Sequence, residues 1–154
     1  MASYIERDIN HPSVIIWSIG NEVYERAGLG DGYAVSRKLA EKVRSLDTSR
    51  PTMLACCSLW NGLNDKDRAV VQKLHAEGSS QNGDWSYTHR IWADRTESTL
   101  APVDIAGYNY MEDRYESDHE LFPDRVICGT ESFPLQIDRV WELVMKNDHV
   151  IGDF

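Results

Sequence analysis

An uncharged apolar run near the start of the chain constrains the fold more than any other stretch. Residues 13–19 carry no charged side chain and are dominated by β-branched and aromatic residues. The turn sequence Asn10-His11-Pro12 precedes this run and ends any earlier helix, because the residue before a proline is pushed out of the helical region. A short apolar run between turn signals is typical of a fully buried strand. We therefore predict a buried strand over about residues 13–19.

An amide and a carboxylate follow this strand directly, at Asn21 and Glu22. In parallel α/β barrels the catalytic side chains lie at the carboxyl ends of the strands, so Glu22 is at a position typical of a catalytic residue in such a fold. Taken alone, the pair is weak evidence, because Glu22 can equally be a solvated residue in the first turn of the next helix. The wider sequence context has to decide between these two interpretations.

The fifteen residues 8–22, DINHPSVIIWSIGNE, resemble the acid/base signature of glycoside hydrolase family 2. This family includes the β-galactosidases and β-glucuronidases, and its catalytic domain is a (β/α)8 barrel. Ile9 is the one position where the family pattern usually carries a basic or bulky residue. The resemblance implies that Glu22 is the general acid/base and that Asn21 hydrogen-bonds the 2-hydroxyl group of the sugar.

A second glutamate ends another apolar run, since residues 125–134 pass from branched residues through small ones to Glu131. This stretch resembles the nucleophile strand of the same family, which implies that Glu131 attacks the sugar. The run 103–110 ends in an amide and a phenol, Asn109 and Tyr110, which are candidate substrate contacts at the rim of the site. Tyr110 resembles the family's tyrosine that hydrogen-bonds the nucleophile, and such a bond favours the ionised carboxylate. The alternative is a rim tyrosine that water alone satisfies.

The chain has room for about five βα units, because a complete (β/α)8 barrel takes about 250 residues, or roughly 31 per unit. We therefore expect an α/β fold, a partial (β/α)8 TIM barrel comprising roughly strands four to eight. Residues 1–154 are expected to be the C-terminal part of a family 2 catalytic barrel that is truncated at both ends. Besides the strand at 13–19, periodicity and turn signals predict helices over 2–9, 33–46, 115–123 and 136–146, and strands over 52–57, 103–110, 125–131 and 149–154.

Residues 58–100 are predicted to be irregular, with one modest helical candidate at about 65–76. Long loops inside a compact domain are usually functional, and this one follows a barrel strand on the catalytic face. Tryptophan rings stack on the apolar C–H faces of sugars, so Trp60 is a candidate substrate contact, and Trp85 and Trp92 are considered with it. The alternative is that these rings close a small satellite cluster beneath the loop.

The two glutamates are expected to lie three strands apart, since roughly 31 residues form one unit and the segment 58–100 is discounted. A retaining glycosidase holds its two carboxyl groups about 5 to 5.5 Å apart, with one as nucleophile and the other as acid and then base. The predicted function is a retaining glycoside hydrolase, most similar to β-galactosidases, with a carbohydrate substrate. Two alternatives stay open: β-glucuronidase as the activity, and an inactive barrel fragment that serves only as a carbohydrate-binding or assembly module.

The net charge of −9 and the pI near 4.9 argue against a nucleic-acid partner, because no basic stripe is available to replace phosphate counterions. No stretch reaches the about 18 to 20 apolar residues of a membrane span, so a soluble bacterial protein is expected, in the cytoplasm, the periplasm or outside the cell. The three cysteines are predicted to be buried thiols on strands.

No cofactor and no metal are predicted, because family members that recruit magnesium take further ligands from strands that this chain lacks. Parallel strand edges that stay exposed can pair with another copy of the chain, so homo-oligomers are also predicted.

Overall fold

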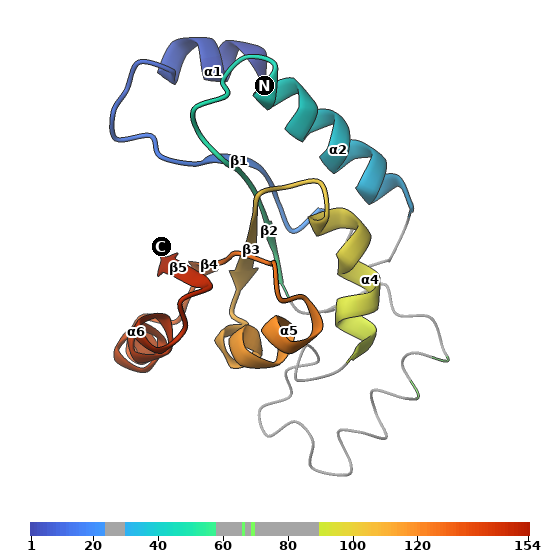
Figure 1. Ribbon diagram of the computed structural model, residues 1–154, viewed down its shortest axis with the longest axis vertical. Coiled ribbons are helices and arrows are strands. Elements are labelled where there is room, and N and C mark those ends of the chain that lie inside the picture. Colours follow the sequence, from blue (N-terminus) through green and yellow to red (C-terminus); the bar gives the residue numbers. More distant parts are fainter. Residues whose placement is uncertain (24–29, 58–65, 67–68, 70–89) are drawn as a thin grey trace.

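Five parallel strands alternate with helices along the chain (Figure 1). The computed structural model describes residues 1–23, 30–57, 66, 69 and 90–154. The strands pair in the order β1-β2-β3-β4-β5, and every pair is parallel. Parallel strands that pair in sequence order and alternate with helices form a partial (β/α)8 barrel, the fold class that the sequence predicted. The elements are α1 (Ala2–Asp8), β1 (Trp17–Asn21), α2 (Gly30–Arg44), β2 (Thr52–Cys56), α4 (Arg90–Leu100), β3 (Ile105–Asn109), α5 (Tyr115–Leu121), β4 (Ile127–Glu131), α6 (Ile137–Lys146) and β5 (Val150–Asp153), with single 3-10 turns η2 (Glu112–Arg114) and η3 (Pro134–Gln136).

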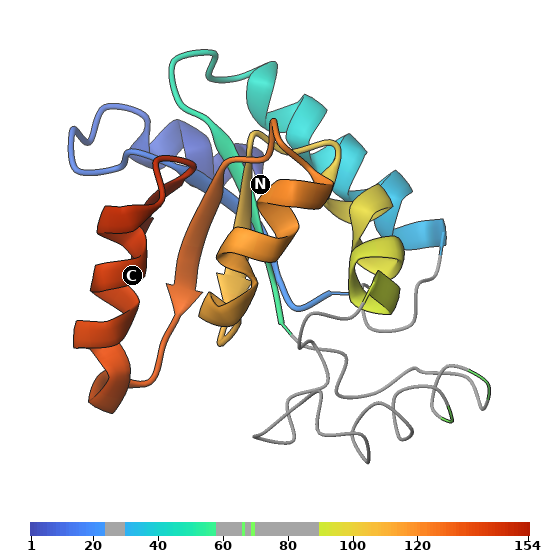
Figure 2. The same ribbon diagram turned by 60° about the horizontal axis from the view of Figure 1, so that its bottom comes forward.

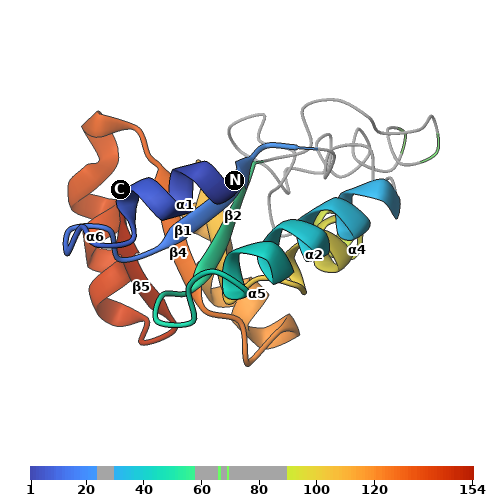
Figure 3. The same cartoon turned by 90° about the horizontal axis from the view of Figure 1, so that it is seen from above.

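The helices pack on one face of the sheet and bury the main core. Figure 3, seen from above, shows them spread along this face, with α6 beside β5 at one end and α2 with α4 at the other. Helices α2 and α4 lie side by side (Figures 1 and 2). Neighbouring residues of a strand point to opposite faces, so Leu54 packs in the main core, whereas Met53 packs with Ile105 and Cys128 in a smaller cluster. In a barrel this second face is the interior.

The first strand begins four residues later than predicted, at Trp17. The amide of Trp17 donates to the carbonyl of Pro51 and starts the ladder with β2. Before this point the guanidinium of Arg50 donates to the carbonyls of Ile9 and Val14, at 2.9 and 2.6 Å, so these groups face a side chain instead of a strand. The burial prediction was also wrong, because β1 buries Trp17 and Ile19 but exposes Ser18.

Residues 90–100 form the helix α4, although the sequence predicted irregular chain there. Three of its buried residues, Trp92, Thr96 and Thr99, are spaced three or four apart, as on one face of a helix. Two of the three are polar, which is why hydrophobic periodicity did not reveal the helix. The buried hydroxyl of Thr96 keeps a hydrogen-bond partner, because it donates to the carbonyl of Trp92 at 2.8 Å.

Trp92 belongs to the main core and not to a sugar site. Its indole is fully buried, donates to the carbonyl of Cys57 at 2.8 Å and meets the ring of Tyr108 edge to face at 5.2 Å. Trp60, Trp85 and all of the helical candidate at 65–76 except residues 66 and 69 lie outside the described part of the chain.

The remaining elements agree with the predicted ranges to within a few residues, and α2 differs most. It begins at Gly30, three residues before the predicted start, and ends at Arg44. The cysteines are buried and free, with Cys56 on β2, Cys57 directly after it and Cys128 on β4, which confirms the prediction of buried thiols. No helix within residues 1–23, 30–57 and 90–154 is long and apolar enough to cross a membrane.

The outer strands β1 and β5 each pair with one strand in the described part of the sheet. Several apolar side chains near β5 are exposed, including Trp141 at 50% and Met145 at 73%. The predicted homo-oligomer stays a prediction. We expect light scattering at micromolar concentration to report a mass above that of one chain, and a compact monomer without exposed apolar surface contradicts it.

A cluster of buried charged side chains contacts Tyr108 of β3. Asp118 is fully buried, accepts the hydroxyl of Tyr108 at 2.6 Å and pairs with the guanidinium of Arg114, which is 1% exposed. A second guanidinium, that of Arg125, lies 3.9 Å from the same carboxylate. Burial, and then the charge of Asp118, raise the pKa of Tyr108 well above its ordinary value.

Replacing Asp118 with asparagine is expected to lower the free energy of unfolding by about 3 to 5 kcal/mol, because two guanidinium groups keep their charge while their buried partner loses its own. Urea unfolding of the wild type and of D118N measures this loss. The matched control is Glu120→Gln, which neutralises an exposed carboxylate on the same helix. Equal stabilities of the two variants would show that the cluster is not a stability determinant.

Asp47 fixes the start of β1 and makes stability depend on pH. Its carboxylate accepts four hydrogen bonds, from the amide and hydroxyl of Ser49 at 2.7 and 2.6 Å, from the indole of Trp17 at 2.8 Å and from Arg50 at 2.7 Å. The hydroxyl of Ser49 and then the indole of Trp17 hold the pKa of Asp47 well below its usual range. A depressed folded-state pKa stabilises the fold above the unfolded value, about 3.9 for aspartate, and this contribution is lost as the pH falls below it.

We therefore expect Asp47→Asn to lower the free energy of unfolding at pH 7. The difference in this free energy between the variant and the wild type should narrow between pH 4 and pH 2. Urea unfolding across this range measures the difference. Asp148→Asn removes an exposed carboxylate and serves as the control. A difference that stays constant with pH would contradict the assigned role of Asp47.

Candidate active site

Polar side chains meet where neighbouring strands end. Asn21 is the last residue of β1, Asn109 the last of β3 and Glu131 the last of β4, and Glu22 follows β1 directly. Because the strands are parallel, their carboxyl ends lie at the same edge of the sheet, where barrels hold their chemistry. The two glutamates lie three strands apart in the sheet order, as the sequence predicted. Trp60, the remaining predicted site residue, lies outside the described residues.

A bulge near the end of β1 and another near the end of β4 set the directions of the site side chains. On β4, Gly129 pairs with Tyr108 and Glu131 pairs with Asn109, so Thr130 is an extra residue between two paired positions. Strand β1 likewise has one residue more than β2 between two paired positions, because Ser18 pairs with Met53 and Asn21 pairs with Ala55. A bulge bends a strand and redirects the side chains beside it. The pairing of Asn109 with Glu131, instead of with Thr130, follows from this extra residue.

The backbone turns sharply directly after β1 and after β3. Glu22 has a φ of 51° and Tyr110 a φ of 56°, which are the positive-φ residues other than glycine in the described chain. The amide of Glu22 still donates to the carbonyl of Ala55 at 2.8 Å, and the amide of Tyr110 to that of Glu131 at 2.7 Å. A non-glycine residue in this region costs about 1 to 3 kcal/mol and persists where its surroundings determine it. These hydrogen bonds hold both turns in place.

The side-chain amide of Asn109 connects the site. Its nitrogen lies 2.9 Å from Oε1 of Glu131, 3.0 Å from Oε1 of Glu22 and 3.0 Å from the side-chain oxygen of Asn21. Its oxygen accepts a hydrogen bond from the hydroxyl of Thr130. Two oxygens that both lie about 3 Å from one nitrogen are at most about 6 Å apart, so the carboxyl groups can act on one small substrate bond.

The carboxylate of Glu131 accepts several hydrogen bonds. It accepts from the amide of Asn21 at 3.3 Å as well as from Asn109. The hydrogen bond of the Tyr110 hydroxyl to Glu131 is the first cause that raises the pKa of this phenol, followed by partial burial and by the charges of Glu131 and Glu22. The ring of Tyr110 packs at 4.8 Å from that of Phe133, which is 55% exposed. The predicted contact between Tyr110 and the second glutamate is thus present.

Sequence reasoning missed the contacts that hold the end of β4. The hydroxyl of Ser132 donates to Asp153 on β5 at 2.7 Å. The same carboxylate of Asp153 lies only 2.0 Å from the position that a Cβ atom on Gly129 would take, and the hydroxyl of Tyr115 lies 2.6 Å from it, so a larger residue cannot replace this glycine unless these side chains move. The run of small residues around Glu131 was the available signal, because it indicates close packing against a neighbouring strand.

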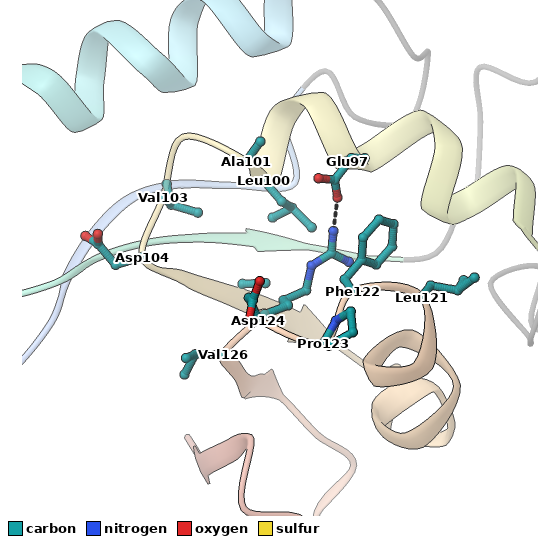
Figure 4. Close-up of a pocket in the computed structure, with 12 residues that line it drawn as sticks. Glu97, Leu100, Ala101, Val103, Asp104, Leu121, Phe122, Pro123, Asp124 and Val126 are labelled. Atoms are coloured by element: carbon teal, nitrogen blue, oxygen red, sulfur yellow. Dashed lines mark hydrogen bonds and ion pairs between the residues drawn. The ribbon is translucent and has the colours of Figure 1, made fainter.

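The opposite end of the strands carries a hollow of about 430 Å³, lined by residues between the end of α4 and the start of β4 (Figure 4). Its lining includes Asp104 and Val126, which directly precede β3 and β4, so it lies at the amino ends of the strands. There Arg125 pairs with Glu97 and stacks over the ring of Phe122 at 3.7 Å. In barrels this end serves stability, and we assign no chemistry to it.

Among the described residues, no three His, Cys, Asp or Glu side chains are arranged to hold a metal ion. The absence of a metal from the protein stays a prediction. The roles of Asn21, Asn109 and Tyr110 toward a substrate also stay predictions, and Asn109 is fully buried in this structure.

Solved structures share this arrangement of strands and helices. A glycosyl hydrolase family 2 member from Bacteroides cellulosilyticus DSM 14838 superposes with a TM-score of 0.72 and 35% identity, over 99% of this chain and 16% of that chain. The β-D-glucuronidase of Dictyoglomus thermophilum superposes with a TM-score of 0.53 over 97% of this chain and 26% of its own, and its 20% identity supports the fold alone.

Two curated relatives are β-galactosidases. That of Lactococcus lactis subsp. lactis (strain IL1403) is 30% identical over 94 residues, and that of Streptococcus thermophilus is 35% identical over 71 residues. These matches cover 57% and 44% of this chain but 8% and 6% of the relatives' lengths. The family model "Glycosyl hydrolases family 2, TIM barrel domain" matches residues 1–86. With more than half of its length in that match, the chain belongs to glycosyl hydrolase family 2 and carries part of its TIM-barrel domain.

Proposed function

We propose that this chain carries the catalytic centre of a retaining β-glycosidase that acts on β-galactosides. The observation that carries the proposal is the position of Glu22 and Glu131, whose oxygens both lie about 3 Å from the amide nitrogen of Asn109. A separation of at most about 6 Å is compatible with the about 5 to 5.5 Å of retaining enzymes, whereas inverting enzymes keep about 6.5 to 9.5 Å.

The two carboxyl groups then divide the reaction between them. Glu131 attacks the anomeric carbon and forms an ester, while the bond to the leaving oxygen breaks and Glu22 gives that oxygen its proton. In the second step Glu22, now a carboxylate, takes a proton from water, and the water oxygen displaces Glu131. The donors around Glu131 suit a group that begins and ends this cycle with a negative charge.

The preference for galactosides is drawn from the two curated relatives, and it is the finer part of the proposal. The fold neighbour named a β-glucuronidase makes glucuronides the alternative substrates. A galactoside is neutral and a glucuronide carries a carboxylate, so a site for glucuronides needs a cation facing that group.

Hydrolysis of aryl β-D-galactosides and aryl β-D-glucuronides by the purified chain tests the proposal, with proton NMR to identify the first anomer released. We expect the galactoside to be the better substrate and the β-anomer to form first. A first product with the α configuration would refute retention, and preference for the glucuronide would refute the substrate. A folded chain that binds galactosides without hydrolysing them would establish a binding module instead.

A further inference from the structure

Asn109 faces no open space at the rim, although sequence reasoning made it a candidate substrate contact. It is fully buried at the end of β3, and its side chain contacts Asn21, Glu22, Thr130 and Glu131. Two of these neighbours are the glutamates to which the proposed function assigns the chemistry. A side chain that touches both, and is shielded from the substrate, acts through them.

The orientation of this amide is determined by its neighbours. The three oxygens around its nitrogen, one each from Asn21, Glu22 and Glu131, accept hydrogen bonds, and a flipped amide would turn its own oxygen toward all three. On the other side the hydroxyl of Thr130 can donate to the amide oxygen. The extra residue in the β4 bulge is what places this hydroxyl beside Asn109.

The amide group has two hydrogens but three acceptors within 3.0 Å, so it cannot serve all three fully at once. The proposed reaction moves negative charge between two of them. Glu131 is charged before attack and neutral in the ester, whereas Glu22 gives up its proton and becomes charged in the ester. A charged acceptor binds an N–H more strongly than a neutral one.

We propose that Asn109 is a positioning residue shared by Glu22 and Glu131, whose amide follows the negative charge from one to the other during the cycle. The inference rests on the proposed function, because it takes the two steps from it. One donor between two carboxyl groups stabilises the charged form of each in turn without a movement of the backbone.

The first test is Asn109→Asp, which keeps the size of the side chain and replaces the shared donor with a third carboxyl group. We expect kcat to fall by about 10² to 10³, the effect of losing one preorganised donor. The alkaline limb of the pH profile should move to higher pH, because a new negative charge helps a neighbouring acid to keep its proton. Asn147→Asp is the matched control, since the side-chain amide of Asn147 donates to the carbonyl of Leu143 near the end of α6 and not to a glutamate of the site. A merely structural role would lower activity and leave the pH limbs in place, and that result would overturn the proposal.

The second test needs no turnover. In a chain with ¹⁵N-labelled asparagine, the Asn109 amide signals are identified by their loss in N109D. We expect them to shift in both Glu22→Gln and Glu131→Gln, while those of Asn147 stay unchanged. Signals that respond to one variant only, or to neither, would overturn the inference. An inactive wild type with the expected shifts would refute the proposed function and leave the shared donor standing.

Discussion

Replacing Glu131 with alanine is expected to lower kcat for an aryl β-galactoside by about 10⁴- to 10⁶-fold, the scale on which removal of a nucleophile acts. Glu131 ends β4 and accepts from Asn21, Asn109 and Tyr110, so its loss removes the attacking oxygen and an acceptor that these three donors share. Turnover under saturating substrate measures the effect. Glu142→Ala, which truncates an exposed residue of α6, is the matched control and should retain wild-type activity.

Azide separates loss of the nucleophile from loss of the fold. In E131A the space left by the carboxylate admits a small anion, which attacks the sugar from the same side. We expect azide to restore turnover and to yield the α-galactosyl azide. Residual hydrolysis above a tenth of the wild-type rate would contradict the role of Glu131, and so would a β-configured azide product.

Replacing Glu22 with alanine is the second large effect, and it should depend on the leaving group. General acid catalysis contributes about 10² to 10⁴ in rate, and a leaving group that needs no proton does not require it. We expect hydrolysis of lactose to fall by that factor, whereas the first step with a dinitrophenyl galactoside should change little. The burst of dinitrophenol measures the first step, and steady-state turnover measures the second.

Azide again reports the position of the missing group. In E22A the ester on Glu131 still forms, and the anion takes the place of the activated water on the opposite face of the sugar. The expected product is the β-galactosyl azide. Equal losses for lactose and for the dinitrophenyl galactoside would mean that Glu22 does not protonate the leaving oxygen.

Much of this site could be predicted because strand ends are visible in a sequence. Uncharged runs that terminate in Glu22 and Glu131 placed both carboxylates at one edge of a parallel sheet, and the structure has them there. Local apolar patterns identify which segments are buried. They do not record where the neighbouring strand begins to pair, and for that reason β1 was placed four residues too early.

The function of Asn109 could not be predicted in the same way. Its contacts depend on an extra residue in β4, which shifts the pairing by one position and brings Glu131 opposite it. No residue type marks such a bulge reliably, and Thr130 is an ordinary strand residue by composition. The helix α4 was missed for a related reason, since two of its buried positions, Thr96 and Thr99, are polar.

The measurement that tests the central claim most directly is mass spectrometry of the chain after inactivation by a 2-deoxy-2-fluoro-galactosyl compound with a good leaving group. The fluorine slows both steps, and the leaving group lets the first proceed, so the ester accumulates. We predict one adduct per chain, on the tryptic peptide 126–139, with fragmentation that places it on Glu131. An adduct on the peptide 8–26, which holds Glu22, or a chain that hydrolyses β-galactosides but forms no adduct, would contradict the assignment.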